Sequence, residues 1–153
     1  PWCWLAKVRL DNAIKHLART SPAITVRLHY RPFMIDPHTK PDGELYADYH
    51  RRRWGGDGWT APMKRMGRAE GAPYANWKIW PNTHHASRLL LEAGRHGLGD
   101  AVIGRLYRAC YEEGENVSRK EVVAAVAREA GVPNGDEYVL SGKGTDELAA
   151  ELA

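Results

Sequence analysis

The spacing of apolar and polar positions predicts a mainly helical protein. In the first segment, apolar residues recur near the helical period at Leu5, Val8, Leu10, Ile14 and Leu17. Pro1 suits the first position of this helix, because the N–H that proline lacks would have no partner there. Periodicity, caps and breakers predict further helices over residues 44–54, 61–69, 82–97, 101–113, 118–130, 136–140 and 145–152. Ser118 and Glu121 fit a capping box at the start of the helix predicted over residues 118–130.

Residues 23–30 predict the one clear strand. Ile24, Val26, Leu28 and Tyr30 alternate with polar residues, and this period of two is typical of a half-buried strand. A strand needs neighbours for its backbone donors and acceptors, and no other segment supplies them. We therefore expect the partner strands to lie outside this stretch, which would make the chain a fragment. Prolines at 32, 37 and 41 predict an extended connection after the strand.

Composition narrows the class of protein. The 153 residues carry 22 Lys and Arg against 19 Asp and Glu, so the net charge of +3 comes from mixed signs. No run approaches the about 18 consecutive apolar residues of a membrane-spanning helix, and the start lacks the order of a signal peptide. We expect a soluble chain with no membrane partner. A cytoplasmic location is favoured, with an organelle or the periplasm left open because the chain does not begin with methionine.

Cys3 is the residue with the clearest chemistry. The N-terminus of a helix stabilises a thiolate through its free N–H groups and its dipole. In a C-x-x-C arrangement the attacking sulfur lies at the helix start and the resolving sulfur one turn further in. Cys3 occupies the inner place, and the attacking cysteine would precede Pro1. The alternative for Cys3 is a buried structural thiol on an amphipathic helix.

The run Pro1-Trp2-Cys3-Trp4, followed by a helix and by Arg31-Pro32-Phe33, resembles DsbA-like thioredoxin-fold proteins of the FrnE type. In that family the redox motif reads Cys-Pro-Trp-Cys, and a helical domain is inserted into the thioredoxin fold. Pro81-Asn82-Thr83 resembles the entry to a helix of that domain, and residues 107–117 resemble its Ala-Tyr-Phe-x-Glu-Gly stretch. The resemblance implies an α/β thioredoxin-like fold with an inserted helical domain, the portion present being mostly α. Residues 1–41 would belong to the thioredoxin-like domain and residues 42–153 to the insertion.

The same resemblance implies a thiol–disulfide oxidoreductase and assigns its residues. Cys3 would be the resolving thiol, with Pro1 and Trp2 completing the catalytic motif. The expected substrate-binding residues are Trp4, Arg31, Phe33 and Asn82. The first cysteine, and the C-terminal half with the cis-proline loop of the family, are not in this sequence. We expect a thiol or disulfide substrate, either protein or small molecule, no cofactor apart from glutathione as a co-substrate, and a homodimer as one oligomeric form.

Two other functions stay open. Kappa-class glutathione transferases and 2-hydroxychromene-2-carboxylate isomerases share this architecture, and a serine before Pro1 would favour their glutathione chemistry. A non-catalytic helical module that binds a partner through exposed tryptophans is the third hypothesis, because fold alone does not fix function.

The remaining candidates favour structural roles. Cys110 lies on an apolar helix face and is expected in the core. His84, His85 and His96 do not make a metal site, since adjacent histidines diverge on a helix by about 100°. Residues 50–54 mix arginines with aromatic rings, but acidic neighbours and the small net charge argue against nucleic-acid binding.

Overall fold

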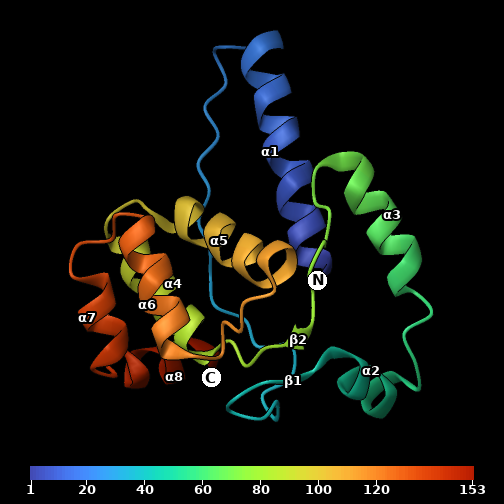
Figure 1. The fold of residues 1–153 in the computed structure, drawn as a ribbon. Coiled ribbons are helices and arrows are strands. Elements are labelled where there is room, and N and C mark those ends of the chain that lie inside the picture. Colours follow the sequence, from blue (N-terminus) through green and yellow to red (C-terminus); the bar gives the residue numbers. More distant parts are fainter.

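The computed structural model describes all residues from Pro1 to Ala153. It is built from helices, with one short antiparallel pair of strands that aligns Glu44 with Trp80 and Leu45 with Ile79 (Figure 1). In chain order the elements are α1 (Trp2–Thr20), β1 (Glu44–Leu45), α2 (Tyr46–Trp54), α3 (Thr60–Glu70), β2 (Ile79–Trp80), α4 (His84–Arg95), α5 (Gly99–Arg108), the π-helical turn η1 (Ala109–Glu113), α6 (Lys120–Glu129), α7 (Gly135–Leu140) and α8 (Thr145–Leu152).

The predicted helices are confirmed, with boundaries shifted by one or a few residues and with three differences in local structure. β1 takes the first two residues of the helix expected from residue 44. The helix expected over 101–113 changes to π geometry at Ala109, a form that is often found at functional sites. The capping box at Ser118 is wrong, because α6 begins at Lys120 and the Ser118 hydroxyl accepts the N–H of Asn82 at 2.9 Å instead.

The strand predicted over residues 23–30 is also wrong. This segment returns from the end of α1 without regular secondary structure (Figure 1). The alternation of Ile24 and Val26 with polar residues is present in the sequence, but both side chains lie exposed, at 55% and 40%. No other strand lies beside the segment, so its backbone groups have no ladder to join, and a strand does not form alone.

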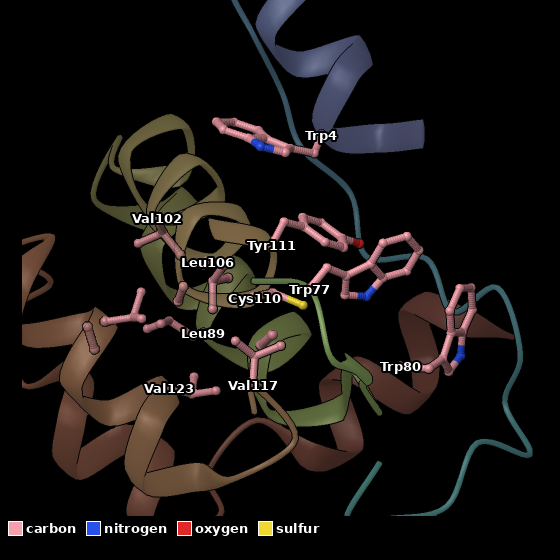
Figure 2. Packing of buried hydrophobic residues seen from close by; sticks show 14 of the residues in the cluster. Trp4, Trp77, Trp80, Leu89, Val102, Leu106, Cys110, Tyr111, Val117 and Val123 are labelled. Atoms are coloured by element: carbon pink, nitrogen blue, oxygen red, sulfur yellow. The ribbon is translucent and has the colours of Figure 1, made fainter. Parts of the chain in front are cut away.

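The hydrophobic core continues from a helical part to an aromatic part. α4 packs against α5, α6, α7 and α8, and aliphatic side chains such as Leu89, Val102 and Val123 fill the space between these helices. Toward β2 the core becomes aromatic and includes Tyr111, Trp77 and Trp80 (Figure 2). The N-terminal end of α1 therefore packs against aromatic rings.

Only the first two turns of α1 are firmly held by the body of the protein. Trp4, Leu5 and Lys7 are buried, whereas most later residues of the helix are exposed and its far end projects (Figure 1). The buried Lys7 ammonium pairs with Asp11 at 2.6 Å and with Asp100 at 3.0 Å. This pairing with the N-terminal end of α5 fixes the direction in which the Cys3 end of α1 enters the core.

Candidate active site

The residues predicted as the catalytic motif lie together where α1 meets the core. Pro1 is buried, Trp2 is 48% exposed, and the Cys3 thiol is free and exposed. Trp4 is 5% exposed, and its ring packs against Tyr107 with the ring centroids 5.6 Å apart. The helix thus presents Trp2 and Cys3 to solvent and uses Trp4 as its anchor.

Cys3 lies at the junction of two clefts. The first, which we call the apolar cleft, has a volume of about 260 Å³ and extends between residues 31–36, α4 and the end of α5. The second, which we call the tryptophan cleft, has a volume of about 450 Å³ and is walled by Trp2, Trp54, Trp59 and Trp80. Pro1, Cys3 and Trp80 line both clefts. A molecule in either cleft would therefore contact the thiol.

Sequence analysis missed the histidine behind the tryptophan cleft. His50 is fully buried, and neither ring nitrogen has a hydrogen-bond partner. The rings of Trp54 and Trp59 lie 4.6 Å and 4.8 Å from it, and Tyr46 lies at 4.0 Å. Burial lowers the pKa of His50 to about 4, so the imidazole is neutral at physiological pH. The clue in the sequence was the density of tryptophans, not the histidine itself.

Tyr107 is the second residue that the sequence did not single out as a site residue. Its phenol lies in the apolar cleft with Cys3, and burial together with this neighbouring thiol raises the pKa of Tyr107. The hydroxyl therefore stays protonated and able to donate a hydrogen bond toward sulfur. Cys110 also lines the apolar cleft but is 3% exposed, and burial raises the pKa of its thiol to about 12. Figure 2 shows Cys110 among the core side chains, as predicted.

The expected substrate-binding residues lie at different depths. Phe33 is 77% exposed at the mouth of the apolar cleft. Arg31 lines the same cleft, and its guanidinium pairs with Glu151 of α8 at 2.5 Å. Asn82 lies outside both clefts, and its side chain is engaged within the protein: the amide donates to the Thr39 carbonyl, and the oxygen accepts the first N–H of α4 from His84. Arg31 and Phe33 therefore share the apolar cleft with Cys3, whereas Trp4 lies buried outside both clefts and Asn82 has a capping role.

The other candidate clusters of the sequence are the histidines of α4 and the arginine-rich segment of α2. No group of three or more His, Cys, Asp or Glu side chains is arranged to hold a metal ion. In the arginine-rich segment, Arg51 and Arg52 pair with Asp48 and Glu44. No helix combines the length and the apolar composition that crossing a bilayer requires.

Comparison with known proteins agrees with this fold. A family model described as the DSBA-like thioredoxin domain matches residues 1–151. The fold is similar to the crystal structure of a probable DsbA oxidoreductase from Streptomyces coelicolor, with a TM-score of 0.82 and 24% sequence identity, over 99% of this chain and 68% of that one. A search of curated proteins gives no match. The resemblance noted in the sequence is thereby confirmed at the level of the family, whereas the FrnE type and the division at residue 41 stay predictions. The chain belongs to the DSBA-like thioredoxin domain family.

Proposed function

We propose that this chain is part of a thiol–disulfide oxidoreductase in which Cys3 is the resolving thiol. The observation that carries the proposal is the position of Cys3: an exposed thiol in the first turn of a 19-residue helix, where two apolar clefts meet. Cys110, the other thiol of the chain, is buried and stays protonated, so it does not compete for substrate.

The reaction needs one further thiol, which we expect in the residue before Pro1. Its thiolate would attack a substrate disulfide, breaking the S–S bond and forming a mixed disulfide, while the released substrate thiolate takes a proton. The Cys3 thiolate would then attack the sulfur of that cysteine. The second substrate thiolate leaves, the substrate is reduced, and the protein holds an intramolecular disulfide. The same steps in reverse oxidise a dithiol substrate.

The walls of the tryptophan cleft favour substrates with apolar groups next to the disulfide. Trp2 stacks on Trp59 at 6.1 Å, and both rings face the cleft beside Cys3. Flat aromatic surfaces bury apolar groups at little cost in side-chain entropy. A disulfide flanked by apolar side chains would therefore bind better than one flanked by charges, and glutathione, which carries carboxylates, would be the weaker substrate.

The test is reduction of a protein disulfide by the full-length protein, with dithiothreitol as the electron source. Cys3→Ala that is reduced first and freed of dithiothreitol before the substrate is added should accumulate a mixed disulfide between the attacking cysteine and the substrate, which non-reducing electrophoresis and mass spectrometry detect. Cys110→Ala, the matched loss of a thiol, should accumulate none. Turnover of Cys3→Ala equal to that of the wild type would contradict the role given to Cys3. A serine before Pro1, with glutathione-dependent turnover, would replace the proposal by transferase or isomerase chemistry.

A further inference from the structure

A tyrosine hydroxyl is inserted into the helical turn that carries Cys3. The Tyr74 hydroxyl donates to the carbonyl of Pro1 at 2.6 Å and accepts the N–H of Leu5 at 3.2 Å. In a regular α-helix the N–H of Leu5 would pair directly with that carbonyl. The N–H of Trp4 also reaches the Pro1 carbonyl, at 3.1 Å. Tyr74 thus holds both ends of the turn that contains Trp2 and Cys3.

The fold keeps Tyr74 there at a cost. Its backbone has a φ of +48°, a left-handed conformation that is uncommon for a bulky residue, and its side chain is 2% exposed. The ring lies against Gly67 of α3, where a Cβ would be 2.6 Å from Tyr74 Cε2. Strained backbone that is held by its surroundings is typical of functional sites. No other contact requires a phenol rather than a phenyl ring at this position, since both of its hydrogen bonds go to the first turn of α1.

The direction of the two hydrogen bonds matters for the thiol. The N–H of Leu5 and the O–H of Tyr74 point the same way, toward the N-terminus of α1, so the hydroxyl extends the row of backbone dipoles by one member. Dipoles aligned in this way favour negative charge at the N-terminus of a helix. The Cys3 sulfur lies at that end, and its thiolate is the form that attacks a disulfide.

We propose that Tyr74 is a positioning residue for thiol–disulfide exchange. Its inserted hydroxyl holds the turn bearing Cys3 open and favours the thiolate of Cys3. This inference rests on the proposed function for its purpose, but it is tested on the thiol alone. The whole interaction of a charge with a helix terminus corresponds to about a two- to fivefold change in the population of thiolate, and the single hydroxyl of Tyr74 supplies part of it, which we take as about twofold.

The experiment compares the rate of Cys3 alkylation by iodoacetamide, as a function of pH, in the wild type and in Tyr74→Phe. We expect the profile of Tyr74→Phe to move to higher pH, with a rate at neutral pH about twofold lower. The titratable or charged groups around the two clefts are Arg31, Asp36, His50, Tyr107, Cys110 and Tyr111. All of them are retained in this variant, so the difference reports Tyr74.

Tyr138→Phe is the matched control, because it removes a phenol hydroxyl of α7 that has no hydrogen-bond partner and lies outside both clefts. Loss of stability alone would not move the pH profile of the folded protein. A Tyr74→Phe profile that overlays the wild type would overturn the inference. If the variant does not fold, NMR of the wild type decides: the Tyr74 hydroxyl proton should exchange slowly with water, and fast exchange would refute the insertion. A wild type that alkylates normally but fails to reduce disulfides would refute the proposed function and leave the role of Tyr74 standing.

Discussion

Gly67 connects the packing of α3 to the turn that carries Cys3, and replacing it with alanine tests that connection. The glycine lies inside α3, where the chain that follows the helix folds back over it. A Cβ at this position would be 2.3 Å from the carbonyl oxygen of Ala72 and 2.6 Å from the ring of Tyr74. The N–H of Ala72 donates to the carbonyl of Gly67 itself at 2.7 Å, so the returning loop is tied to the residue from which it would have to move.

Three contributions set the change in the free energy of unfolding that Gly67→Ala causes. Glycine to alanine in a helix interior normally stabilises a protein by about 0.5–1 kcal/mol. Overpacking a closed site costs about 1–3 kcal/mol, and a backbone oxygen does not swing away as the tip of a side chain does. Loss of the hydrogen bond between Ala72 and Gly67 adds about 1 kcal/mol. The sum predicts that Gly67→Ala lowers the free energy of unfolding by about 2 kcal/mol.

Gly94→Ala is the matched control. Gly94 is also helical, in α4, and nothing lies within 4 Å of the Cβ that it would gain. The same substitution there should raise the free energy of unfolding by about 0.5–1 kcal/mol. Urea unfolding of both variants, followed by far-UV circular dichroism, measures the two changes with one assay. The opposite signs separate the effect of the site from the effect of alanine in general.

Equal changes in the two glycine variants would refute the argument, because the clash with Ala72 and Tyr74 would then have no energetic consequence. A second result follows from the same geometry. If Gly67→Ala folds by displacing the ring of Tyr74, the alkylation profile of Cys3 should change in the direction expected for Tyr74→Phe. Gly94→Ala should leave that profile where it is.

Three further predictions concern buried polar groups. Arg88 is 1% exposed and donates to the carbonyls of Tyr138, Val139 and Lys143. Because one ammonium does not replace the guanidinium fork, Arg88→Lys should lower the free energy of unfolding, measured in urea, by about 2–3 kcal/mol. Wild-type stability of this variant would contradict the prediction. Because burial lowers the pKa of His50 to about 4 while the unfolded chain titrates near its ordinary value of 6.5, the unfolded state binds more protons in that window, and stability should fall by up to about 3 kcal/mol from pH 6.5 to pH 4. His50→Phe should remove this part of the pH dependence, and an unchanged slope in thermal unfolding against pH would exclude His50 as its source. In Cys3→Ala, Cys110 should react with an alkylating reagent such as iodoacetamide only as fast as the protein unfolds, since burial raises its pKa to about 12 and the thiolate is scarce. Rapid labelling of Cys110 in the folded variant, located by mass spectrometry of its peptide, would disprove its inertness.

The helices could be predicted from the sequence because their signals are local. The apolar spacing of α1 and the glycine that ends α3 act within a few residues of the elements they define. The strand over residues 23–30 could not be judged in this way. Alternation fixes which side chains would share a face, but a strand forms only if another strand pairs with it, and that is a property of the whole fold. Ile24 and Val26 have the alternation of a strand, but they lie exposed and no other strand pairs with their segment.

The residues of the candidate site differ in the same way, because some depend on local sequence and others on the whole fold. Cys3 could be proposed as a site residue because the role proposed for it depends on its place in its own helix. Tyr74 acts on α1 from 69 and 73 residues further along the chain, through Leu5 and Pro1, and no spacing rule links such positions. His50 was visible only as part of a basic, aromatic run, and its burial depends on rings supplied by separate segments, such as Trp59 and Trp77.

The sequence nevertheless contains one local signal that another segment packs closely against α3. Gly67 interrupts a helix whose C-terminal cap, Gly71, lies only four residues further on. A glycine inside a helix lowers its stability, so its presence indicates a close approach of other atoms. The sequence thus marks the point on α3 where something must pass. The sequence does not indicate that the neighbouring group is a tyrosine in a left-handed conformation. That depends on the path by which residues 71–78 return to the N-terminal end of α1. The role proposed for Cys3 therefore follows from its own helix, whereas the environment of its thiol is set by the chain that returns over Gly67.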